Sequence, residues 1–175
     1  MIWFWVILLG VFFTFGFVVF RGAPYIPSQK KFLKLALRDL YHLTSKDVLV
    51  DIGSGDGVVL RQASKIGARA VGFELNPVLV LLSRFLSRGD KRVSVHLVDF
   101  WLTHLPDDAT VVYIFSVGRD MKKMMKWMQK EATRIGRPIS LISFGFGFNN
   151  IKADKITGPY YLYIFHPLHQ LKPQV

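Results

Sequence analysis

The sequence contains no cysteine among its 175 residues. Disulfide bonds, thiolate metal sites and cysteine nucleophiles are therefore excluded. The five histidines are not spaced as metal ligands, and we expect no metal site. A chain of this length is sufficient for one domain with a sizeable core.

Acidic residues are also scarce. Twelve Asp and Glu against 23 Lys and Arg give a formal net charge of +11. This balance favours anionic partners and leaves two classes open, nucleic acid and an anionic membrane surface. Several of the cations, Lys122, Lys123, Lys126 and Lys130, lie mainly on one side of a predicted helix. A solvated or membrane-facing surface is favoured there over nucleic-acid binding.

Charged residues and proline are absent from Ile2–Phe20. As a helix this run would span roughly 28 Å, close to the hydrocarbon thickness of a bilayer. We expect a transmembrane anchor over residues 1–21 and one domain over residues 22–175. The alternatives are a signal peptide, which would need a basic n-region and a small-residue cleavage site, and a core helix, which would usually carry a polar stripe.

Basic residues follow this run, at Arg21 and at five positions up to Lys46, whereas none precedes it. The positive-inside rule then places the domain on the cytoplasmic (or matrix) side of the membrane. Basic residues close to a membrane also attract anionic headgroups, by about 1 kcal/mol each. This attraction accounts for part of the net charge without nucleic acid.

The rest of the chain alternates between apolar runs and helical patterns. Residues 22–27 form a linker that its prolines hold extended, and Ser28 is expected to cap a helix that runs to about Leu43. We expect strands at 47–52, 69–75, 93–98, 110–115, 138–144 and 160–165, and helices at 57–66, 77–87 and 120–135. This alternation predicts an α/β fold in which helices cover both faces of a mostly parallel sheet.

A glycine-rich run, Asp51-Ile52-Gly53-Ser54-Gly55-Asp56-Gly57, joins the first of these strands to a helix. Glycines allow the backbone to turn sharply and to approach a ligand closely. Glu74 ends the next strand, at the edge of the sheet where ligands bind in such folds. Together they predict a nucleoside-cofactor site; a tight turn with no ligand is the alternative.

The charge of the run indicates which cofactor fits. Asp56 lies inside the turn, where it disfavours the pyrophosphate of a dinucleotide and suits the cationic sulfonium and amino groups of S-adenosylmethionine. Asp51 can order the loop or accept from the amino group, and Glu74 can accept from the ribose hydroxyls. Asp99 ends the third strand and is expected on the adenine side; a capping or surface residue is the alternative.

Four segments, in this order, resemble those of class I, seven-strand methyltransferases: Ala23–Ser28, Asp51–Gly57, Gly72–Pro77 and Asp99–Trp101. More narrowly, they are similar to the membrane-anchored mitochondrial lysine methyltransferases of adenine nucleotide translocase and of the ATP synthase c-subunit, and to their prokaryotic relatives. The resemblance covers roughly residues 22–148. It implies a Rossmann-like sheet behind a transmembrane helix, with S-adenosylmethionine as cofactor.

The resemblance also implies site residues. The cofactor would be held by Tyr25, Pro27, Asp51, Gly53, Ser54, Gly55, Gly57, Glu74, Leu75, Asn76, Asp99 and Phe100. Asp99 would lie at the reaction centre, where we expect it to orient a lysine amine or accept its proton. Trp101 and Phe144 are expected to wall the acceptor channel, with core packing as the alternative for each.

The leading hypothesis is therefore a membrane-anchored methyltransferase that acts on lysine of a protein, with a membrane protein as a candidate substrate. The anchor favours this choice because tethering raises the effective concentration of substrates in the same bilayer. Three alternatives stay open: methylation of a lipid or lipophilic small molecule, methylation of RNA, and a non-catalytic scaffold that binds the cofactor.

Overall fold

The computed structural model describes the chain except for residues 1, 7–8, 11–29, 116–119, 149–150 and 169–175. The predicted linker, its neighbour Ser28 and most of Ile2–Phe20 lie outside the described residues. Within the described part, no helix combines the length and the apolar character needed to cross a bilayer. The transmembrane anchor therefore stays a prediction.

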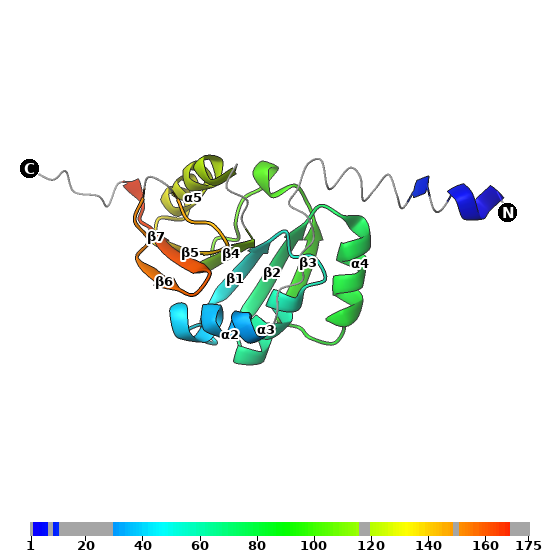
Figure 1. Cartoon of the computed structure of the whole chain (residues 1–175), viewed down its shortest axis with the longest axis horizontal. Helices are drawn as coiled ribbons and strands as arrows, with labels where there is room; N and C mark the ends of the chain where they lie inside the picture. Colours follow the sequence, from blue (N-terminus) through cyan, green and yellow to red (C-terminus); the bar gives the residue numbers. More distant parts are fainter. Residues whose placement is uncertain (1, 7–8, 11–29, 116–119, 149–150, 169–175) are drawn as a thin grey trace, which may run out of the picture.

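The described residues form a seven-stranded sheet in the order β3-β2-β1-β4-β5-β7-β6 (Figure 1). Neighbouring strands are parallel from β3 through to β5, whereas β7 runs antiparallel to both β5 and β6. The strands are β1 (Val48–Ile52), β2 (Arg69–Glu74), β3 (Val93–Leu97), β4 (Val111–Phe115), β5 (Ile139–Phe144), β6 (Lys155–Thr157) and β7 (Tyr160–Phe165). The predicted mostly parallel sheet is confirmed.

Helices cover both faces of this sheet, as predicted (Figure 1). One core cluster joins the sheet to α2 (Lys30–Lys34), η1 (Leu35–Leu40), α3 (Val58–Ile66) and α4 (Pro77–Leu86). The other joins the opposite face to α5 (Met121–Ile135). Residues alternate between the two clusters along each central strand, because successive side chains of a strand point to opposite faces.

The predicted helix from Ser28 to Leu43 is wrong at its end. After α2 the chain widens into the π-helix η1, which ends at Leu40. The backbone N–H of Leu43 then donates to the carbonyl of Leu37 at 2.7 Å, and His42 takes a positive φ of 63°. The wide turn keeps Leu37 and Leu40 in the core while the chain reverses toward β1.

The sheet register brings the predicted site segments to one edge. Ile52 of β1 lies opposite Phe73 of β2, and Glu74 lies opposite Leu97 of β3. The carboxyl ends of these three parallel strands therefore lie side by side. The glycine-rich run, the turn after Glu74 and the segment around Asp99 all leave from that edge.

Candidate active site

The backbone of the glycine-rich run needs its glycines. Gly53, Gly55 and Gly57 have φ values of 73°, 55° and 79°, in the region that residues with a Cβ rarely adopt. The N–H groups of Gly53 and Ser54 donate to the carbonyl of Phe73 at 2.8 and 3.1 Å, which holds the run against the end of β2. A Cβ added at Gly53 would meet no atom of the described residues within 4 Å, so among these residues this side of the run is open to a ligand.

Glu74 joins the glycine-rich run to the turn that follows β2. Its Oε2 accepts the backbone N–H of Gly55 at 2.8 Å, and its Oε1 accepts those of Leu75 and Asn76, each at 2.8 Å. The side chain is buried. Since each carboxylate oxygen has two lone pairs, Oε2 retains one acceptor position. Glu74 can therefore accept one further hydrogen bond while these three persist.

Asp51 is a buried acid within a group of acids. Burial, and then the charges of Glu74 and Asp56, raise the pKa of Asp51 well above its usual range. No hydrogen bond between described residues reaches its carboxylate. A cation placed beside Asp51 would relieve both the burial and the repulsion.

Asp56, which was expected to suit the cationic groups of S-adenosylmethionine, forms an ion pair with Arg61. Its Oδ2 lies 3.3 Å from Nη2 of Arg61, and its Oδ1 accepts the N–H of Val58 at 3.2 Å. Arg61 also donates to the backbone carbonyl of Asp56. Sequence reasoning missed Arg61, which stands one turn into α3, where a basic residue has no distinguishing signal.

Asn76 caps α4, as its position before Pro77 predicts. Its Oδ1 accepts the N–H groups of Val78 and Leu79, at 2.9 and 3.4 Å. Its Nδ2, together with Oγ of Ser54, is buried without a hydrogen-bond partner in the described part of the chain. Each of these two predicted cofactor residues thus has one buried polar atom without a partner among the described residues.

Asp99 is half-buried and caps the short helix η2 (Phe100–Leu102), its Oδ1 accepting the N–H of Trp101 at 3.0 Å. The neighbouring Val98 N–H donates to the carbonyl of Glu74 at 3.0 Å, which places Asp99 beside the end of β2. The capping alternative is thus present in the structure. The cap uses one oxygen of the Asp99 carboxylate. A catalytic role for the other oxygen stays a prediction.

Trp101 lies against Phe100, with ring centres 4.2 Å apart, and the Lys123 ammonium lies 3.8 Å from its ring centre. Lys123 comes from α5 and meets Trp101 only in the folded chain, so local sequence could not reveal the contact. Phe144 packs on Phe115 and Tyr160, at 5.3 and 5.0 Å. Tyr25 and Pro27, predicted to cover the cofactor, lie outside the described residues.

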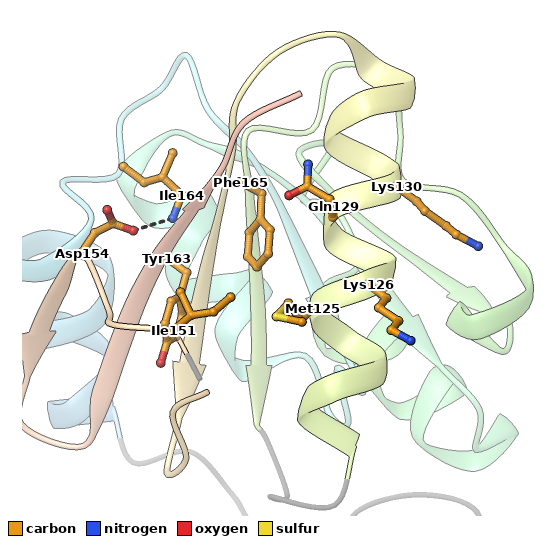
Figure 2. Close-up of a pocket in the computed structure, with 9 residues that line it drawn as sticks. All are labelled: Met125, Lys126, Gln129, Lys130, Ile151, Asp154, Tyr163, Ile164 and Phe165. Atoms are coloured by element: carbon orange, nitrogen blue, oxygen red, sulfur yellow. Dashed lines mark hydrogen bonds between the residues drawn. The ribbon is translucent and has the colours of Figure 1, made fainter. Parts of the chain in front are cut away.

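A separate hollow of about 420 Å³ opens between α5 and β7, away from the glycine-rich run (Figure 2). Its lining is mostly apolar, with Lys126 and Lys130 at the α5 side. Its carboxylate, Asp154, accepts the N–H of Ile164 at 2.8 Å. This hollow contains none of the predicted site residues. The described residues also contain no group of His, Asp or Glu arranged to hold a metal ion.

The strand order with an antiparallel β7, and the acid-lined glycine run after β1, define a class I methyltransferase fold. An RNA methyltransferase from Salinibacter ruber, solved with S-adenosyl-L-homocysteine, shares this fold with a TM-score of 0.73 at 23% identity, over 86% of this chain and 98% of that one. Haemonchus contortus phosphoethanolamine N-methyltransferase 2, solved with S-adenosyl-L-methionine, matches with a TM-score of 0.55 at 20% identity, over 80% of this chain and 34% of that one.

Within this class, the ANTKMT methyltransferase domain family matches residues 51–155, and the chain belongs to that family. Proteins named as lysine N-methyltransferases of the ATP synthase c-subunit are similar to it. The one from Xenopus laevis is 36% identical over 138 residues, which cover 77% of this chain and 58% of that protein. The one from Homo sapiens is 33% identical over 141 residues, which cover 77% and 57%. The chain thus spans little more than half the length of these relatives.

Proposed function

We propose that the protein is an S-adenosylmethionine-dependent methyltransferase that methylates lysine of a protein substrate and is anchored in a membrane by its N-terminal run. The observation that carries the cofactor assignment is the buried Asp51 carboxyl beside Glu74 and Asp56. Together, burial and the two neighbouring charges raise the pKa of Asp51, and a cationic ligand offsets that cost. Dinucleotides carry an anionic pyrophosphate instead and would worsen the repulsion.

The residues present fit this cofactor, which supplies a methyl group on a positively charged sulfur. Asp51 would hold the amino group, and the remaining acceptor position of Glu74 would take a ribose hydroxyl. The open side of Gly53 leaves room for the ligand close to the backbone. Phe100, which leaves from the same sheet edge, would flank the adenine.

Family membership supports a protein-lysine acceptor, because the similar proteins are named lysine N-methyltransferases. A lysine amine must be neutral to attack. At pH 7 its deprotonation costs about 4.6 kcal/mol, from a free pKa near 10.4. We assign Asp99 to orienting the amine and accepting its proton, and Trp101 to one wall of the acceptor channel.

The proposed anchor is supported by the sequence. Ile2–Phe20 carries no charge, and cations follow it but do not precede it. A single span would then leave the domain on the cytoplasmic or matrix side, close to substrates in the same bilayer. Protease protection in sealed, right-side-out vesicles tests this orientation. External protease should digest the domain only after the membrane is opened, and digestion in intact vesicles contradicts the orientation.

Calorimetry with the purified full chain tests the cofactor assignment, with NAD as the dinucleotide control. We expect S-adenosylmethionine to bind and NAD not to bind. Because a bound cation lowers the pKa of Asp51, binding should release protons, which is measured by titrations in buffers of different ionisation enthalpy. The release should vanish in Asp51→Asn. The proposal is refuted if the chain binds no S-adenosylmethionine and if Glu74→Ala leaves the calorimetric titration unchanged.

A further inference from the structure

Helix α4 carries five of its seven large apolar side chains on the outside of the molecule. Their spacing, i, i+3, i+4, i+7 and i+8, makes one continuous row, a pattern that normally faces a core. Here the row faces solvent, and its members are between 42% and 65% exposed: Val78, Leu81, Leu82, Phe85 and Leu86. We call this row the α4 stripe.

The orientation of α4 is held by packing that larger side chains could not satisfy. The face toward the sheet carries Val80 and the small residue Ser83, and a Cβ at Gly57 would lie 2.1 Å from Oγ of Ser83. Arg84 donates twice to the carbonyl of Val95, at 2.7 and 3.0 Å. Neither Leu82 nor Phe85 would fit against Gly57, so rotation of α4 cannot bury the stripe.

Cations gather at the end of the stripe. The Arg88 guanidinium lies 4.3 Å from the ring centre of Phe85, and Lys91 and Arg92 follow and are exposed. Helix α4 itself contains no acid. The neighbouring Asp90 accepts the backbone N–H of Arg92 at 3.0 Å. An apolar row edged by Lys and Arg is the pattern of helices that lie in the membrane interface.

We propose that the α4 stripe, with Arg88, Lys91 and Arg92, is a membrane-contact surface that enters the interface of an anionic bilayer. Anionic headgroups complement the cations at its edge and the net charge of +11. A bilayer therefore matches both parts of the surface.

This contact is separate from the N-terminal anchor and does not depend on methyl transfer. It has a consequence for the candidate site, because α4 begins directly after Glu74 and Asn76. Contact of the stripe with lipid would hold that edge of the sheet at the membrane surface. An acceptor side chain that emerges from a membrane protein would then be presented to the site at short range.

The absence of cysteine allows a direct test on the full chain. A single Leu81→Cys variant is labelled with an environment-sensitive fluorophore and reconstituted into phosphatidylcholine vesicles with and without phosphatidylserine. Ile156→Cys is the matched control, because this residue is 59% exposed and lies on β6, at the opposite edge of the sheet. Nitroxides on the lipid chains and aqueous iodide serve as the two quenchers.

The label at Leu81→Cys should be quenched by lipid nitroxides and protected from iodide, most strongly with phosphatidylserine, whereas the label at Ile156→Cys stays open to iodide. Adding Arg88→Gln and Lys91→Gln should weaken the contact roughly tenfold or more. A Leu81→Cys label that stays open to iodide in vesicle-bound protein overturns the proposal and leaves the anchor untouched. A label shielded from both quenchers also overturns it, because a protein surface then covers α4.

Discussion

Replacing Glu74 by Gln tests how the candidate site is held together, because the change keeps the side chain's shape and removes one acceptor. Gln has a single carbonyl oxygen, which can serve the N–H groups of Leu75 and Asn76. Its amide nitrogen would then face the N–H of Gly55. Both groups are donors, so the hydrogen bond that Gly55 makes to the native carboxylate is lost. We expect the glycine-rich run to lose its attachment to the turn after β2.

The magnitude follows from these three bonds. A buried N–H without an acceptor costs about 1–3 kcal/mol, and each of the other two bonds weakens by about 1 kcal/mol when its acceptor becomes neutral. Removing the charge of Glu74 also relieves the repulsion on Asp51, which offsets part of the loss. A net destabilisation of about 2–4 kcal/mol corresponds to a fall in Tm of about 5–15 °C for a domain of this size.

Thermal denaturation and calorimetry with S-adenosylmethionine are the assays, and the affinity should fall by about 10- to 100-fold. Asp154→Asn is the matched control. It makes the same kind of change at an exposed carboxylate that, among the described residues, accepts only the N–H of Ile164, and we expect a loss of stability below about 1 kcal/mol. If Glu74→Gln melts and binds like the native protein, the carboxylate does not organise the site and the reasoning fails.

Three further predictions concern buried charge and close packing. Because folding raises the pKa of Asp51, the stability of the protein should fall as pH rises above the usual carboxyl range. Asp51→Asn should therefore have a higher melting temperature at pH 7 and should bind S-adenosylmethionine more weakly. Gly57→Ala should lower the free energy of unfolding by about 1–3 kcal/mol or more in urea titrations. Adding Ser83→Gly to this variant removes the clash and should restore only part of that loss, because residue 57 keeps its positive φ. Burial raises the pKa of Glu131, but hydrogen bonds from His104, Arg134 and the Leu105 N–H outweigh it and lower the pKa. The contribution of Glu131 to stability is therefore present at neutral pH and is lost as pH falls through the lowered pKa. In Glu131→Gln, the melting temperature should depend less on pH in the acid range.

Local patterns predicted most of the fold because strand and helix boundaries carry their own chemistry. Asn76 and Pro77 mark the start of α4, and Gly136 marks the end of α5 in a left-handed conformation. The edge strand β6 was missed, since three residues of Lys-Ile-Thr are too short for a periodic signal. The π-helix η1 was missed as well, because its widened turn depends on packing against the sheet.

Those parts of the candidate site that lie within one segment of the chain could be predicted from the sequence. Contacts between segments that are distant in the sequence could not. The glycine-rich run and Glu74 follow from spacing, and the register of β1, β2 and β3 brings them together as expected. The three backbone bonds to Glu74 and the Lys123 ammonium over Trp101 are tertiary contacts without a local signal.

The α4 stripe is a regular apolar row that faces solvent, although such a row normally faces a core. Its spacing predicts a core-facing row, yet the close approach of Ser83 to Gly57 turns that row outward. Packing of Ser83 against Gly57 limits which face of the helix can be buried.

Reaction and acceptor are tested together by transfer of a labelled methyl group from S-adenosylmethionine into membranes by the full chain, followed by separation of protein, lipid and RNA. We expect label in protein that is recovered as methyl-lysine after hydrolysis, that resists nuclease, and that is reduced in Asp51→Asn. Label in the lipid extract or in RNA would contradict the acceptor. Binding of S-adenosylmethionine with no transfer into any fraction would contradict the enzymatic function itself.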